Sequence, residues 1–296
     1  KYSSLVENGW QDGTQNKNRV ASVMTINGGT FSGGLNTIKN DDYGELIING
    51  GELSSYAQAC VLNWNTAKIT GGTFDGTGSS NGVVLNGYLN DTMDKGELTI
   101  TGGSITGGTA IEAKMGTIII SGDAQITGTG KYTESEPENG GSSPEGSALL
   151  LSSQMYGNYK GQCRESNELT VKITGGTLTS QNGNAVTVYN TEQQTGDDAQ
   201  TTDVAITGGE LSGKLGAIVS VVASDKNEVT TGENQQTASK SQTTLTVSGD
   251  VAPASINTDG KTTYYTTVSG AVEDIEGSED ETQISVFGNT TISTDV

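Results

Sequence analysis

A short apolar pattern followed by a Gly-Gly pair recurs along most of the chain. Each copy places apolar residues at alternate positions, then a glycine pair or Gly-Asp, then a further apolar residue. Alternation with a period of two is typical of a strand with one buried face, and glycine permits a sharp corner. The clear copies are Ile26–Phe31, Ile48–Leu53, Ile69–Phe74, Ile100–Ile105, Ile173–Leu178 and Ile206–Leu211, and the degenerate ones are Ile120–Ile126 and Val247–Ala252.

A third apolar segment follows each copy and predicts a further short strand, as in "ACVLN", "GVVLN", "TAIEA" and "NAVTV". The first intervals between repeats are 22, 21, 31 and 20 residues, so the unit carries insertions of variable length. Three short strands cannot bury their apolar faces alone, but successive units can stack. The pattern predicts an all-β fold, a right-handed parallel β-helix or solenoid with three short strands per turn and about nine or ten turns. A β-sandwich is the alternative fold, although it has no reason to repeat the same corner.

The predicted organisation is a single domain in three parts. Residues 1–19 are expected to form an N-terminal cap over the first turn, and residues 20–252 form the repeats. Residues 253–296 are expected to add terminal turns or a cap of the same helix, with the last 10–15 residues as a final turn. Since the chain starts at Lys1 and shows no anchor at its end, we expect it to be part of a longer, secreted surface protein.

These units, of the form xLxIxGGTFxG followed by AIxV, resemble those of the pectate-lyase-like β-helix superfamily. More narrowly, they are similar to the Gly/Thr-rich repeat regions of adhesin-like proteins secreted or held in the cell wall by gut-type Gram-positive bacteria. The resemblance covers about residues 20–252 and implies an extracellular or cell-surface location. It is nearly silent on activity, because members of the superfamily include lyases, hydrolases, adhesins and phage tail proteins.

Most long insertions follow the third segment of a unit, so stacking would gather them along one edge of the rod. These insertions are at about 40–45, 86–96, 152–168, 189–203 and 224–243, with one exception at about 127–146. The candidate ligand-binding residues are rings at the same edge: Trp64, Tyr88, Tyr156 and Tyr189. Flat rings beside amides and carboxylates suit the faces of sugars; the alternative is that they only cap loop packing. Asn63 and Asn86, which hold equal positions in adjacent units, are expected to form a stacked amide ladder.

The charge and composition of the chain exclude some classes of binding partner. The chain has 35 acidic and 15 basic residues, a net charge of −20, and no histidine. Nucleic acids and anionic membranes would be repelled, and no apolar run approaches the roughly 18–20 residues of a membrane span. The predicted partner is a glycan or a host surface protein, with no nucleic acid and no membrane insertion, and we expect a monomer. Cys60 is expected to be a small buried residue, whereas Cys163 lies in a polar insertion, and nothing supports a disulfide between them.

No catalytic residue, metal site or cofactor is predicted. The strings Asn257–Gly260 (NTDG) and Gly196–Asp198 (GDD) resemble polygalacturonase motifs, but their order is reversed and the family's His and Arg-x-Lys motifs are missing. The lack of histidine also excludes Ser-His-Asp and Cys-His nucleophile systems. Acidic stretches such as "YTESEPENGG" lack the spacing of calcium loops, so calcium is conceivable but unsupported.

Two functions from different classes follow. The preferred hypothesis is a non-enzymatic extracellular surface protein, a β-helical adhesin or stalk whose loop-bearing edge binds a glycan or host protein. The alternative is a polysaccharide lyase or glycoside hydrolase with an atypical carboxylate site. An enzyme should bring two or three carboxylates, or Asp with Lys, within about 5–10 Å of one another in a groove. A purely spacing role and an ice-binding face with regular Thr ranks are further alternatives.

Overall fold

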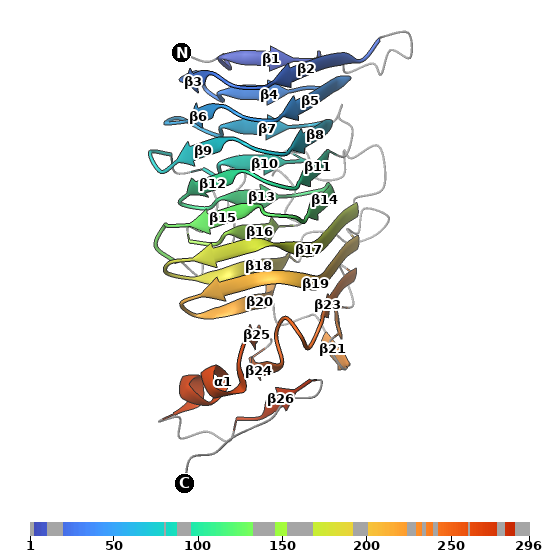
Figure 1. Cartoon of the computed structure of the whole chain (residues 1–296). Helices are drawn as coiled ribbons and strands as arrows, with labels where there is room; N and C mark the ends of the chain where they lie inside the picture. Colours follow the sequence, from blue (N-terminus) through green and yellow to red (C-terminus); the bar gives the residue numbers. More distant parts are fainter. Residues whose placement is uncertain are drawn as a thin grey trace.

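The computed structural model describes residues 3–10, 20–79, 81–87, 96–132, 146–152, 168–191, 201–223, 229–232, 235–238, 242–259, 261–276 and 282–287. In these residues the chain forms one 15-stranded and one 11-stranded sheet, built from short strands stacked one unit above the next (Figure 1). Pairing between successive units is parallel throughout the repeats. The predicted all-β, parallel solenoid is therefore confirmed at this level.

The 15-stranded sheet contains the first and second strands of each unit, which meet at the Gly-Gly corner. First strands are β2 (Ser22–Ile26), β5 (Gly44–Ile48), β8 (Thr66–Ile69), β11 (Glu97–Ile100), β14 (Gly116–Ile120) and β23 (Gln242–Val247). Second strands are β3 (Thr30–Ser32), β6 (Glu52–Ser54), β9 (Thr73–Gly76), β12 (Ser104–Gly107) and β15 (Gln125–Gly128). Two long strands, β17 (Glu168–Ser180) and β19 (Thr201–Gly213), run through the corner and serve as both. A side hairpin, β21 (Val229–Gly232) and β22 (Gln235–Ala238), pairs with β23.

The 11-stranded sheet contains the third strands, and we call it the third-strand sheet. Its parallel members are β1 (Val6–Asn8), β4 (Ile38–Asn40), β7 (Val61–Asn63), β10 (Val84–Asn86), β13 (Ile111–Ala113), β16 (Leu149–Ser152), β18 (Asn184–Thr191) and β20 (Gly216–Ala223). β1 lies within the predicted N-terminal cap and pairs in parallel with β4, so this part of the chain extends the third-strand sheet.

The corner glycines explain why the six-residue motif repeats. Gly51 has φ of 113° and Gly72 has φ of 100°, both in the left-handed region that glycine tolerates best. A Cβ on Gly51 would lie 3.0 Å from the carbonyl oxygen of Gly29, and one on Gly72 would lie 3.1 Å from that of Gly51. Each corner thus stacks directly on the corner before it, and a side chain would separate them.

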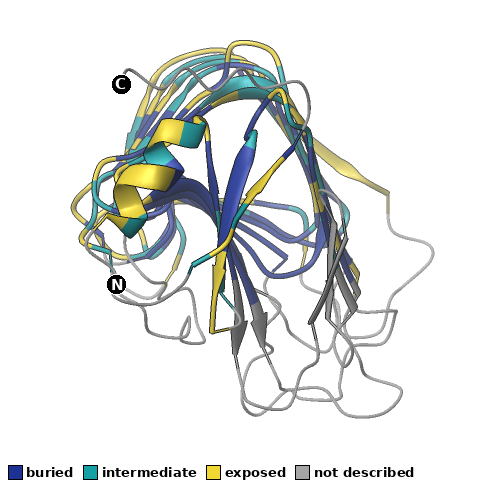
Figure 2. Ribbon diagram, turned by 90° about the horizontal axis from the view of Figure 1, so that it is seen from below, coloured by how far each residue is buried: buried dark blue, intermediate teal, exposed yellow. Residues whose placement is uncertain are grey.

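The interior is a continuous apolar column formed by the inward positions of all three strand types. Figure 2, which looks along the stack, shows the buried parts of successive strands superimposed around this interior. The largest fully buried side chains include Phe74, Ile38, Leu46, Ile48, Leu53, Ile69, Leu98 and Ile100. These are the Ile, Leu and Phe positions of the repeat, so the alternation in the sequence corresponds to burial.

A ladder of buried asparagine amides runs along the C-terminal ends of the strands in the third-strand sheet. The Nδ2 of Asn8 donates to Asn40 Oδ1 at 2.8 Å, Asn40 to Asn63 at 2.8 Å, and Asn63 to Asn86 at 2.7 Å. The predicted contact between Asn63 and Asn86 is confirmed, and the ladder extends two units further toward the N-terminus. It ends at Ala113, which pairs with Asn86 in register. Because the amides also donate to nearby carbonyl oxygens, they fix the turn after each strand.

The parallel stack gives way to an antiparallel unit at the C-terminal end. β25 (Lys261–Tyr265) pairs antiparallel with β20, β24 (Ala254–Thr258) pairs with β25, and β26 (Ile284–Val286) pairs with β24. The helix α1 (Val268–Ile275) packs against these strands and starts at the N-cap Thr267. β25 therefore covers the edge of β20 that would otherwise be open to another strand. Much of the expected final turn lies outside the described residues, which end at 287.

Candidate functional site

A row of side chains runs down the outer side of the third-strand sheet, and we call it the outer row. The register aligns its members from unit to unit: Glu7, Lys39, Leu62, Leu85, Glu112 and Leu150. They alternate with the inward-facing residues on the same strands. The row therefore begins with two charged residues and continues with two leucines before the next charge.

A hollow of about 380 Å³ opens at the charged end of this row, and we call it the N-terminal hollow. Its lining residues are Ser3, Ser4, Glu7, Leu35, Asn36, Lys39, Gln58, Leu62, Trp64 and Leu85. Leucine and tryptophan side chains supply the apolar wall, and hydroxyls, amides and two charges supply the rim. This volume lies at the lower end of the range of about 300–1,000 Å³ that is typical of ligand pockets.

Lys39 is at the centre of a charged cluster beside the hollow. Its Nζ donates to Asp41 Oδ2 at 2.8 Å, lies 3.6 Å from Glu7 Oε1, and lies 4.1 Å from the centroid of the Trp64 ring. The Asp41 side chain is fully buried, that of Lys39 is 15% exposed, and that of Glu7 is 50% exposed. Glu7 pairs with Lys39 across β1 and β4, and Asp41 lies two residues beyond Lys39 on the same side.

The environment makes Asp41 easier to protonate than an ordinary aspartate. The pKa of its carboxyl is raised from 3.8 to about 6, chiefly by burial and then by the contact with Glu7, while Lys39 acts in the opposite direction. Removal from water disfavours the ionised carboxylate more than one nearby ammonium favours it. The cluster therefore takes up a proton in mildly acidic solution.

Of the four predicted ring residues, the structure describes two, and these two lie on separate strands of the third-strand sheet. Trp64 lines the N-terminal hollow, but it is only 5% exposed and Lys39 lies over its ring. Tyr189 is 4% exposed on β18. Three strands separate β7 from β18 in the sheet, which puts Trp64 and Tyr189 roughly 19 Å apart at the usual strand spacing. Tyr88 and Tyr156 lie outside the described residues.

The sequence reasoning missed Glu7, Lys39 and Asp41. The sequence does contain a signal for the first two of them. In the third segments "VEN", "IKN", "VLN" and "VLN", the middle residue belongs to the outer row, and it is charged in the first two segments and apolar in the last two. A second ion pair on the same side, Glu112 Oε1 with Lys114 Nζ at 3.0 Å, is almost completely buried. It lies beyond Leu85 and does not line the N-terminal hollow.

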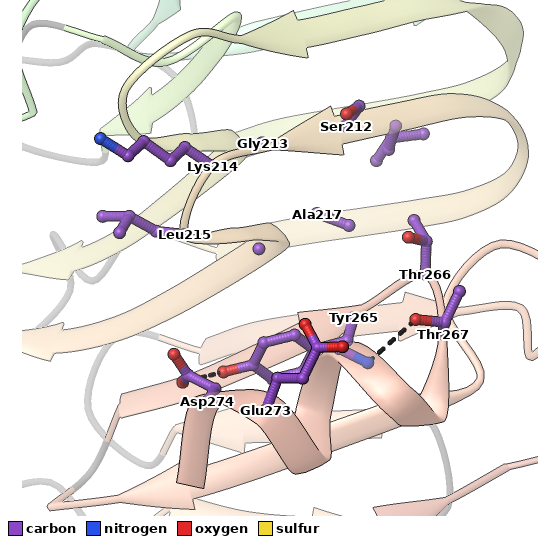
Figure 3. A pocket seen from close by; sticks show the side chains of 13 residues that line it. Ser212, Gly213, Lys214, Leu215, Ala217, Tyr265, Thr266, Thr267, Glu273 and Asp274 are labelled. Carbon is purple, nitrogen blue, oxygen red and sulfur yellow. Dashed lines mark hydrogen bonds between the residues drawn. The ribbon is translucent and has the colours of Figure 1, made fainter. Parts of the chain in front are cut away.

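A second hollow, of about 320 Å³, lies between the last parallel unit and the antiparallel unit (Figure 3). We call it the C-terminal hollow. The turn Gly213–Gly216 forms one side, and Tyr265 with Glu273 and Asp274 of α1 forms the other. Tyr265 Oη donates to Asp274 Oδ2 at 2.5 Å, and burial, followed by this contact, raises the pKa of the tyrosine.

The described residues offer little for metal or thiol chemistry. Among them, no group of three or more Cys, Asp or Glu side chains could hold a metal ion, and no helix is long and apolar enough to cross a membrane. Cys60 is buried as predicted, and this burial raises the pKa of its thiol to about 12. Of the two polygalacturonase-like strings, the first begins at Asn257 on β24 of the antiparallel unit, and the second, with Asp198, lies outside the described residues. Cys163 also lies outside them.

Comparison of the chain with protein-family models, with curated proteins and with solved structures finds no match in any of the three. The function therefore has to be argued from the residues of the site.

Proposed function

We propose that this chain is a rod-like part of an extracellular surface protein and that it binds a glycan in the N-terminal hollow. The observation that carries the proposal is the mixed lining of this hollow. Leu62, Leu85 and Trp64 supply its apolar lining, while Glu7 and Lys39 supply its charged lining. Sugars present C–H patches bordered by hydroxyls, so they need both kinds of surface in one small site.

The rest of the chain suits a stalk. A continuous apolar column joins each unit to the next, and the amide ladder links the units that contain Asn8, Asn40, Asn63 and Asn86, which favours a rigid rod over a flexible linker. We further propose that the solenoid is right-handed with about nine or ten turns, that it is related to the adhesin-like pectate-lyase superfamily, and that it acts as a monomer at the cell surface.

A glycoside hydrolase or lyase is the second candidate, and one observation favours it. Glu7, Lys39 and Asp41 gather at the hollow, and a carboxyl with a pKa of about 6 is suited to act as a general acid. Against this, the Asp41 side chain has no exposed surface, so a bound sugar would not reach it without a rearrangement. Binding without turnover is therefore the preferred hypothesis.

A glycan array combined with a polysaccharide degradation screen tests the proposal. Leu85→Arg would fill the hollow and should abolish binding, while Val23→Arg, at a site 60% exposed on β2, should bind like the wild type. Circular dichroism would check that both variants fold. Release of sugar products would support the enzyme instead, and the absence of binding to every glycan would leave only the spacing role.

A further inference from the structure

We infer that the N-terminal hollow selects glycans with free amines, such as chains of glucosamine, over neutral and acidic sugars. The inference rests on the proposed function and names the ligand class of the same site. It follows from the balance of charges around Lys39 and from the lining of the hollow.

Among the described residues, the charged cluster has two carboxylates and one ammonium. The Lys39 Nζ lies 2.8 Å from Asp41 Oδ2 and 3.6 Å from Glu7 Oε1. With both Glu7 and Asp41 ionised, these two and Lys39 carry a net charge of −1, so a cation would complete the cluster.

The geometry directs the unbalanced charge toward the hollow. Among the described residues that line it, Glu7 and Lys39 are the charged ones. The ammonium of Lys39 is closest to the buried Asp41, whereas the Glu7 side chain is 50% exposed. A bound amine could therefore reach Glu7 and form a charge-assisted hydrogen bond in a partly desolvated site.

Acidic sugars face the opposite situation. A carboxylate or sulfate entering the hollow would meet Glu7, and Lys39 is already held by Asp41. The net charge of −20 on the whole chain adds a long-range repulsion for polyanions and an attraction for polycations. Neutral sugars would make the apolar contacts but leave Glu7 without a cation.

The lining favours an amino sugar over a basic peptide. Leu62 and Leu85 are adjacent in register and line the hollow side by side, with 6% and 5% of their surface exposed to a sugar ring. The hydroxyls of Ser3 and Ser4 and the amides of Asn36 and Gln58 lie around it, which matches the many hydroxyls of a sugar better than the plain methylene chain of lysine. The ring face of Trp64 is not needed, because Lys39 occupies it.

Isothermal titration calorimetry at pH 6.5 tests the inference, because the lysine amines are protonated there and the less basic amines of glucosamine are protonated in part. The probes are a glucosamine tetramer, its fully N-acetylated form, a galacturonic acid tetramer and tetralysine. We expect the glucosamine tetramer to bind at least about five-fold more tightly than the other three, the effect of one partly buried ion pair.

Two matched variants separate local recognition from general attraction. Glu7→Gln should remove the preference for the amine, whereas Glu210→Gln, an exposed site on β19, should preserve it. Equal loss in both variants, or equal binding of tetralysine or of the galacturonic acid tetramer, would overturn the inference. If only the N-acetylated tetramer or another neutral glycan binds, the inference fails while glycan binding stands. If no glycan binds, both fail.

Discussion

Asp41 should make the fold more stable in mild acid than at neutral pH. Its folded pKa of about 6 lies above the ordinary value of 3.8, so the folded chain binds this proton more tightly than the unfolded chain does. Protonation of Asp41 therefore stabilises the folded chain. The stabilisation is complete below pH 3.8 and is lost as the pH rises through about 6. Asp41→Asn removes the titration while keeping the size and much of the polarity of the side chain.

The expected magnitude follows from the same two values. The full difference between 3.8 and about 6 corresponds to about 3 kcal/mol in the free energy of unfolding. Between pH 7.5 and pH 4.5 the linkage relation yields about 2 kcal/mol, because this carboxyl is still mostly ionised in the unfolded chain at pH 4.5, so the full difference is not yet reached. The complete burial of the Asp41 side chain means that solvent screening removes little of this effect.

Urea unfolding of the wild type and Asp41→Asn at the two pH values measures this effect. The free energy of unfolding of the wild type, relative to the variant, should rise by about 2 kcal/mol from pH 7.5 to pH 4.5. Asp203→Asn, at an exposed position on β19, is the matched control and should change this difference by less than about 0.5 kcal/mol. A difference that stays constant, or that falls in acid, would refute the reasoning, because Lys39 would then stabilise the ionised form more than burial disfavours it.

Three further outcomes are expected. Asn63→Ala should lower the free energy of unfolding by about 2–4 kcal/mol in urea denaturation, since it leaves buried amide partners unpaired, while Asn49→Ala in an exposed amide pair should cost under about 1 kcal/mol. Phe74→Ala should cost about 3–5 kcal/mol by the same measurement because its ring is fully buried; a cost below about 1 kcal/mol would contradict the packed interior. The affinity for the glucosamine tetramer, corrected for the fraction of its amines that is protonated, should fall from pH 6.5 to pH 5, since protonation of Asp41 frees Lys39 to neutralise Glu7; a rise in this corrected affinity, measured by calorimetry, would count against the charge balance.

The buried positions and corners of the repeat could be predicted from the sequence alone, because each unit has the same packing and turn requirements. Alternating apolar residues predicted the buried positions of Ile48 and Ile69, and the glycine pair predicted the corner at Gly51. The equal places of Asn63 and Asn86 in adjacent units predicted their hydrogen bond. In each case the partner in space occupies the same position one unit away, so the period itself identifies the contact.

The C-terminal unit and the charged cluster needed information that the period does not contain. The sequence predicts terminal turns or a cap of the same helix for residues 253–296, and nothing in the repeat predicts that Lys261–Tyr265 pairs antiparallel with β20. Lys39 and Trp64 occupy different positions of their units and are 25 residues apart, so only the cross-strand register shows that the ammonium lies over the ring. The sequence predicts an exposed platform at Trp64, but its ring packs in a buried cluster with Ala59, Leu62 and Leu85.

A crystal structure of the chain with a bound glucosamine tetramer would test glycan binding in the N-terminal hollow most directly. We expect the sugar to lie against Leu62 and Leu85, with an amine nitrogen within about 3 Å of the Glu7 carboxylate, the distance of a charge-assisted hydrogen bond. An empty hollow at a saturating concentration, or a sugar bound instead in the C-terminal hollow beside Tyr265, would contradict it.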